Sequence, residues 1–327
     1  MDRPQPTGDA GLADDSGDET VDGGAETRGC TVGAALHGQR LDKVLVTLAP
    51  EFSRNHLQSL IERGHVQLDG ERAGPASRRL RAGQRLQLEL VPTEESLAFR
   101  PQPMALNILY EDEHLLVIDK PAGLVVHPAP GNWSGTLLNG LLAHHASAAT
   151  LARAGIVHRL DKDTSGVMMV GKTLAAVTAL VRDISARDVH RSYLALAHGQ
   201  PAAAQWTIES PIGRDPRVRV RMAVVAGGRP ARTDVECLAQ QAGHCALRCI
   251  LHTGRTHQIR VHLASTGLPL VADAVYGGKP ALGMQRQALH ARRLQLAHPL
   301  SRALVTFECP PPADFAAAWA LVTDLPA

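Results

Sequence analysis

Short apolar runs bounded by glycine and proline dominate the larger part of this chain. From about residue 106 onward, segments such as Leu115–Lys120, Val167–Val170 and Tyr193–His198 have the length of strands. A helical pattern is clear at 174–184 and again at 257–266, but strand-like segments outnumber helical ones, and most connections are short enough for hairpins. The pattern predicts an α+β fold whose main part is a mixed domain around a largely antiparallel sheet.

A different pattern comes before this domain. Apolar residues at helical spacing in 41–48 predict one helix, and Ser53 suits the N-cap of a second helix that ends at Gly64. A short strand at 65–70 and an alternating strand at 84–90 follow. Two helices and two strands within about fifty residues predict a small, separate domain.

The 327 residues therefore divide into four expected parts. Residues 1–30 are small, polar and acidic, and we expect a disordered tail there. Residues 37–92 form the small domain, residues 93–104 form a proline-containing linker, and residues 105–320 form the larger domain.

The net charge of +2 hides an uneven distribution. The first 29 residues hold eight acidic and two basic residues, so the rest of the chain is clearly basic. A basic body fits a polyanionic partner. No apolar run reaches the roughly 18 residues of a membrane helix, and the N-terminus does not resemble a signal peptide, so we expect a cytoplasmic protein without a membrane partner.

The five scattered cysteines indicate free thiols. His244, Cys245, Cys249 and His252 could suggest zinc, but the segment alternates like a strand. Cys245 and Cys249 would then lie about 13 Å apart at roughly 3.3 Å per residue, too far to share a metal ion.

The segment richest in side chains that could take part in catalysis is His158–Gly166, which lies between the apolar runs 155–157 and 167–170. Charged residues between core strands are costly unless they are paired or functional. Thr164, Ser165 and Gly166 can hold a tight turn that presents the carboxylate of Asp161. Taken alone, such a segment is more often a solvated loop whose Asp residues cap backbone groups.

Two further parts of the sequence contain candidate site residues. In 253–262 a strand ends at Gly254 and a helix follows, with Arg255 and Arg260 near its start. An arginine on the floor of a cleft needs an anionic partner and would hold a nearby carboxylate ionised, although a surface helix explains the segment equally well. Tyr193 enters a strand in a chain with only 3% aromatic residues, and by itself it is explained by half-buried packing.

Together these segments resemble the RluA-type pseudouridine synthase family, most closely its RluD-like large-subunit rRNA enzymes. The resemblance covers about residues 37–315, and it includes a region similar to an S4 RNA-binding domain at 37–92. It rests on these long motifs: His158-Arg-Leu-Asp-Lys-Asp-Thr-Ser-Gly166, Gly254-Arg-Thr-His-Gln-Ile-Arg-Val-His262, Leu109-Tyr-Glu-Asp-Glu113, Lys120-Pro-Ala-Gly-Leu-Val-Val-His-Pro128 and Asp273-Ala-Val-Tyr-Gly-Gly278.

The resemblance implies roles for particular residues. Asp161 matches the essential aspartate, Arg260 the arginine that pairs with it, and Tyr193 the tyrosine that stacks on the target base. Arg159 matches the residue that fills the gap left by the flipped base, and Arg255 is a further candidate for RNA binding. In the small domain the candidate phosphate-binding residues are Arg54, Arg78, Arg79 and Arg81.

The resemblance also implies partners and chemistry. It predicts a monomer that acts on ribosomal RNA, 23S rRNA or a large-subunit precursor, without a metal or an organic cofactor. One alternative is a haloacid-dehalogenase-type phosphatase, because Asp161-Lys-Asp163-Thr164 loosely matches its two-aspartate loop, but His158 and Arg159 interrupt the apolar strand that such a loop follows. A second alternative is a non-catalytic RNA-binding protein, in which Asp161 would be dispensable.

Overall fold

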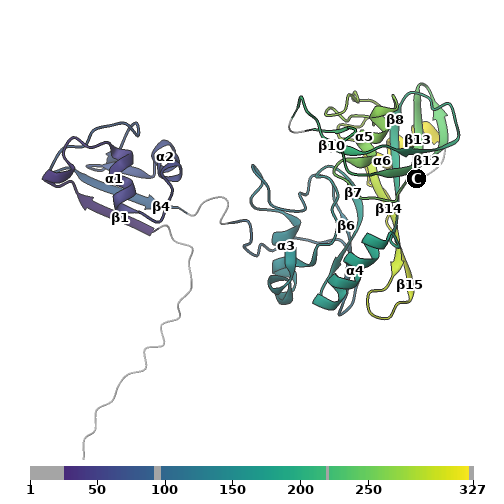
Figure 1. Ribbon diagram of the computed structural model, residues 1–327, viewed down its shortest axis with the longest axis horizontal. Helices are drawn as coiled ribbons and strands as arrows, with labels where there is room; N and C mark the ends of the chain where they lie inside the picture. Colours follow the sequence, from purple (N-terminus) through teal and green to yellow (C-terminus); the bar gives the residue numbers. More distant parts are fainter. Residues whose placement is uncertain (1–25, 92–96, 219–220, 324–327) are drawn as a thin grey trace, which may run out of the picture. The chain divides into compact units, whose positions relative to one another are not determined.

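The computed structural model describes residues 26–91, 97–218 and 221–323. The chain divides between residues 93 and 94 into two compact units, which Figure 1 shows in colours that follow the sequence. The predicted acidic tail lies outside the described residues up to residue 25.

The N-terminal unit combines a four-stranded antiparallel sheet with two helices. The sheet has the order β1-β4-β2-β3. Its elements are β1 (Glu26–Thr31), α1 (Leu41–Leu48), α2 (Arg54–Arg63), β2 (Val66–Leu68), β3 (Glu71–Arg72) and β4 (Arg85–Leu90).

Local sequence signals explain most of this unit. The Ser53 side chain accepts a hydrogen bond from the backbone N–H of His56 and so caps α2, which ends at Gly64 with a φ of 89°. The inner face of α2 buries Leu57, Leu60 and Ile61 in the same core as α1. These observations confirm both predicted helices and their buried faces.

The prediction of a tail over residues 1–30 was wrong at its C-terminal end. Residues Glu26–Thr31 form β1, which pairs along its whole length with β4. Arg28 contributes ion pairs to Glu26 and Glu51. An edge strand is held mainly by backbone hydrogen bonds to its neighbour, and composition does not reveal this pairing.

The C-terminal unit is built on a large mixed sheet. Among the described residues its strands follow the order β5-β6-β7-β14-β8-β13-β12-β9, and β15 pairs with β14. The strands are β5 (Ile108–Glu111), β6 (Leu115–Lys120), β7 (Ser165–Gly171), β8 (His190–His198), β9 (Gln205–Glu209), β12 (Arg232–Gln241), β13 (His244–Leu251), β14 (Leu289–Ala297) and β15 (Leu304–Glu308). A separate hairpin joins β10 (Ile212–Arg214) to β11 (Met222–Val224).

Among the described residues, β7 pairs with β14 in parallel, and the other neighbouring strands of this sheet pair antiparallel. At the parallel pairing the two backbones approach closely at Gly166, where φ is 118°, and a Cβ atom would lie 2.3 Å from the carbonyl oxygen of Ala291. Only glycine fits there. The sheet confirms the prediction of a largely antiparallel α+β fold.

Four helices of the unit are α3 (Leu137–His144), α4 (Leu174–Ala186), α5 (Gln258–Ser265) and α6 (Ala313–Thr323). Figure 1 shows α4 beside β7, which it contacts. The helix predicted over 174–184 is confirmed, and its buried face combines Leu180 with small residues. Ala176, Ala179 and Leu180 are buried, whereas Leu174 is 70% exposed. Small residues bring α4 close to the sheet, and Leu174 extends away from it.

Residues 97–104, expected to be linker, are tied to the C-terminal unit. The Asn139 side chain on α3 donates hydrogen bonds to the carbonyls of Leu97, Ala98 and Arg100, and Gln102 accepts one from the backbone of Gly135. Buried amide contacts of this kind order a segment that its prolines alone would leave extended. The linker residues 93–96 lie outside the described residues.

Candidate active site

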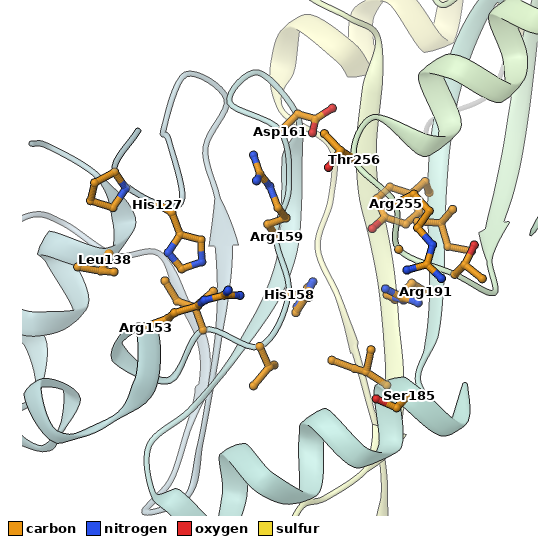
Figure 2. Close-up of a pocket in the computed structure, with 18 of the residues that line it drawn as sticks. His127, Leu138, Arg153, His158, Arg159, Asp161, Ser185, Arg191, Arg255 and Thr256 are labelled. Carbon is orange, nitrogen blue, oxygen red and sulfur yellow. The ribbon is translucent and has the colours of Figure 1, made fainter. Parts of the chain in front are cut away.

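A cleft of about 890 Å³ opens in the C-terminal unit. Figure 2 shows side chains from the 158–161 loop between two walls, one with His127 and Arg153 and the other with Arg191 and Arg255. Tyr193 on β8 and the 251–256 segment that follows β13 complete the lining. The segments that sequence analysis selected from three distant parts of the chain therefore meet at one cavity.

Asp161, which lines this cleft, is in direct contact with Arg260. Arg260 Nη1 donates to Asp161 Oδ2 over 3.0 Å, although 99 residues separate the two positions. The Asp161 side chain keeps 16% of its surface exposed, while that of Arg260 keeps 6%. A carboxylate that a buried guanidinium holds on one oxygen is fixed in position and leaves its other oxygen for a ligand.

Arg260 is itself fixed by Asp273, which is 1% exposed. Its Nε donates to Asp273 Oδ2 over 2.7 Å and its Nη2 to Asp273 Oδ1 over 2.9 Å. Burial opposes the charge of Arg260, but its hydrogen bonds to Asp273 and the negative charge of Asp161 outweigh burial and raise the pKa of Arg260. The guanidinium thus bridges two carboxylates and stays permanently charged.

An aromatic ring and an imidazole complete this group. The Arg260 guanidinium carbon lies 5.0 Å from the centre of the Tyr276 ring. The Tyr276 hydroxyl accepts from the backbone N–H of Met222 and lies within hydrogen-bond distance of His257 Nδ1, at 2.8 Å. Burial lowers the pKa of His257, whose Nε2 lies 3.9 Å from Asp161 Oδ1.

The buried ammonium group of Lys120 holds the turn that carries Asp161. The Lys120 side chain is fully buried at the end of β6, and its Nζ donates to the carbonyls of Pro121, Leu124 and Lys162. Burial lowers the pKa of Lys120 to about 8, against the opposing charges of nearby carboxylates. These bonds fix the backbone next to Asp161 and limit where its carboxylate can move.

Tyr193 shares the cleft with Asp161. It lies on β8 opposite Ala291 of β14, is 5% exposed and lines the same cavity. Burial raises the pKa of Tyr193, which keeps its hydroxyl neutral at physiological pH. The three candidate residues Asp161, Tyr193 and Arg260 together line a smaller pocket that shares Asp161 and Tyr193 with the cleft.

Basic side chains surround this space. Arg159 and Arg255, both predicted from the sequence, line the cleft, as do Arg153, Arg187 and Arg191. Among the lining residues of the described chain Asp161 is the one acid. A cavity with one paired carboxylate and several arginines favours a polyanionic ligand.

Two histidines of the cleft are neutral. Burial first, and then the charges of Arg153 and Arg159, lower the pKa of His127 to about 4. His158 Nε2 accepts a hydrogen bond from the backbone N–H of Met169, and burial together with Arg191 lowers its pKa to about 3. The positive charge of the cleft therefore comes from its arginines.

The four arginines predicted in the N-terminal unit are exposed, but their environments differ. Arg54 donates to buried Asp42 over 2.7 Å, and Arg40 pairs with the same carboxylate. Arg78 and Arg79 donate to backbone carbonyls, whereas the Arg81 side chain forms no hydrogen bond or ion pair within the described residues. Arg54 thus has a structural partner that Arg81 lacks.

The segment considered for zinc forms strand β13, as its alternation predicted. Cys245 and Cys249 are buried in it, and burial raises the pKa of both thiols, to about 12 for Cys245. Protonated thiols are poor metal ligands.

The contact of Asp161 with Arg260, in a basic cleft beside Tyr193, agrees with the comparisons. The sequence model of the RNA pseudouridylate synthase family matches residues 114–265, and that of the S4 domain matches residues 39–86. A ribosomal large subunit pseudouridine synthase D of Neisseria meningitidis serogroup B is 49% identical over 299 residues, which cover 88% of this chain and 79% of the relative. The chain belongs to the RNA pseudouridylate synthase family. It is an isomerase that converts uridine in RNA to pseudouridine.

Other relatives agree. A ribosomal large subunit pseudouridine synthase D of Xanthomonas campestris pv. campestris is 47% identical over 313 residues, which cover 92% of this chain and 93% of the relative. Among solved structures, human RNA pseudouridylate synthase domain containing 1 has a TM-score of 0.52 and 27% identity, and the match covers 67% of this chain and 90% of that one. The family and the S4 domain expected from the motifs are confirmed.

Sequence reasoning missed three members of the site. Asp273, Tyr276 and His257 were not selected, although all three hold or face the pair of Asp161 and Arg260. Asp273 and Tyr276 belong to a motif that carried the family resemblance, so the signal was present. Their partners could be recognised only once the fold brought the loop after α5 next to that helix.

Proposed function

We propose that this enzyme isomerises specific uridines in large-subunit ribosomal RNA and that Asp161 is its catalytic carboxylate. The contact of Asp161 with Arg260 in a cleft that also contains Tyr193 carries the proposal. The relatives named for the large ribosomal subunit suggest the substrate.

The reaction explains why these groups are needed. Pseudouridine forms when the N1–C1′ bond of uridine breaks and a bond from C5 to C1′ replaces it. Asp161 either adds covalently to the nucleotide or removes a ribose proton, and both routes need an ionised carboxylate. The contact with Arg260 holds the Asp161 carboxylate in place for either route.

The detached base must stay in the site while it turns. A stacked nucleotide hides its reacting atoms, so the target uridine is flipped into the cleft. Tyr193 stacks on the uracil, with about 1–3 kcal/mol of stacking energy. Arg159 and Arg255 contact the RNA around the flipped nucleotide, and Arg159 occupies the position that the base has left.

The N-terminal unit adds a second RNA-binding surface to that of the cleft. We propose residues 37–92 as the RNA-binding domain and residues 105–320 as the catalytic domain, with Arg78, Arg79 and Arg81 exposed to phosphates. The protein would act as a monomer in the cytoplasm on ribosomal RNA. Among the described residues, no helix has the length and apolar character that crossing a bilayer requires.

The test is to map pseudouridines in ribosomal RNA from cells that lack this protein and to restore it by variants. We expect Asp161→Asn to restore none of the missing modifications while the purified variant still binds the RNA. Asp163→Asn, two residues along the same turn, is the matched control and should restore them. Restored modification by Asp161→Asn would refute the assignment of the catalytic carboxylate.

A further inference from the structure

Arg191 at the start of β8 is a buried charge without a protein partner in the described part of the chain. It is 6% exposed, and its Nε has no hydrogen-bond partner. Within the described residues its side chain forms no ion pair and no hydrogen bond. A guanidinium stays charged at all physiological pH values, so burial without an anion is costly.

The cleft offers Arg191 no carboxylate. Asp161 is the one acid in the lining of the described chain, and Arg260 already binds its Oδ2. Figure 2 shows Arg191 and Arg255 on the same wall, and both line the cavity. The nearby His158 is neutral and supplies no compensation.

The neighbouring backbone leaves room for this side chain. A Cβ atom at Gly254 would lie 3.0 Å from Arg191 Nη1, which is closer than ordinary van der Waals contact. The glycine therefore allows the guanidinium to lie against the 253–256 segment and face the cavity. Arg191 is held in place by packing, and its charge faces a space that a ligand fills.

We propose that Arg191 binds a backbone phosphate of the RNA next to the flipped uridine. The inference rests on the proposed function and names one contact of it. Uracil is neutral, so the phosphodiester is the anion that RNA brings into the cleft, and the planar fork of arginine matches two phosphate oxygens. Arg191 is thus a substrate-binding residue, and its contact fixes the strand on the wall that Tyr193 shares.

The experiment measures binding of a large-subunit rRNA fragment that contains a mapped target uridine, over a series of salt concentrations. Asp161→Asn serves as the background to prevent turnover. Adding Arg191→Gln should weaken binding roughly 10- to 100-fold, the effect of a lost charge-assisted contact. The slope of log affinity against log salt should fall by about 0.7 to 0.9, the effect of one phosphate contact.

Neutral methylphosphonate substitutions then locate the phosphate. One substitution beside the target should weaken binding to the Arg191-containing protein and have no further effect on the Arg191→Gln protein. Arg191→Lys keeps the charge without the fork and should give an intermediate affinity. Arg182→Gln on α4 is the matched control, since Arg182 is exposed and outside the cleft lining, and it should change neither affinity nor slope.

Thermal unfolding separates a ligand contact from a structural role. Without a protein partner, Arg191→Gln should keep the melting temperature or raise it, because it removes an uncompensated buried charge. A marked drop in melting temperature, or an unchanged salt slope in a protein that still forms pseudouridine, would overturn the inference. Absence of pseudouridine formation by the wild-type protein would instead refute the proposed function.

Discussion

Replacing Asp273 by asparagine tests how the site is held together. Asp273 is 1% exposed and binds Arg260 through two hydrogen bonds, of 2.7 and 2.9 Å. The substitution keeps the shape of the side chain but removes its charge, so Asp161 becomes the one carboxylate that pairs with the buried guanidinium in the described part of the chain. Removal of one partner of a buried pair typically costs about 3–5 kcal/mol.

We expect a loss near the lower end of that range, because the asparagine oxygen still accepts one hydrogen bond. About 3 kcal/mol corresponds to a drop of roughly 6–12 °C in the melting temperature of a domain of this size. Arg260 would also shift toward its remaining partner, so pseudouridine formation should fall strongly. Calorimetry and a pseudouridine assay on the same preparation measure both effects.

The exposed pair of Glu236 and Arg248 supplies the control. Both side chains are partly exposed, at 28% and 47%, so Glu236→Gln should cost less than about 1 kcal/mol and leave activity unchanged. Combining Asp273→Asn with Arg260→Met should recover stability but not activity, because it removes the uncompensated charge. If Asp273→Asn melts at the temperature of Glu236→Gln and retains activity, the reasoning about the anchored guanidinium is wrong.

Two further predictions concern other charged groups. Burial lowers the pKa of fully buried His290 to about 4, so between pH 6.5 and 4 the unfolded chain binds a proton that the folded chain does not. Wild type should therefore lose about 3 kcal/mol relative to His290→Gln over this range, and a difference in unfolding free energy that stays constant with pH would contradict this. In the N-terminal unit, Arg54→Gln should lower the melting temperature because it removes a partner of buried Asp42, whereas Arg81→Gln should leave stability unchanged and reduce the salt slope of RNA binding by roughly 0.7 to 0.9. The opposite pattern for the two arginines would show that their roles are reversed.

Elements with strong local signals were predictable from the sequence. The cap at Ser53, the stop at Gly64 and the alternation of 85–90 depend on neighbouring residues, so periodicity identified them. Strand β6 has the bounds Leu115–Lys120 that its apolar run predicted. In these segments the local preference and the fold agree.

Contacts between segments that are far apart in the sequence could not be predicted from local patterns. Strand β1 has little apolar character of its own, and its pairing with β4 decides its structure. The buried face of α4 depends on which residues are small enough to approach the sheet, and so Leu174 extends outward. Asp273 lies in a loop without periodicity, and its role depends on Arg260, whose position only the fold determines.

The parallel pairing of β7 with β14 affects the order in which the chain folds during its synthesis on the ribosome. Ser165 pairs with His290, so the centre of the sheet cannot close until the chain has been synthesised past β14. Arg286 and Gln287, which bind the Asp161–Thr164 turn, arrive equally late. Strands of the N-terminal unit all lie within residues 26–90, so that unit can fold first. In a nascent chain, the proposed RNA-binding unit would therefore fold well before the active site around Asp161 is complete.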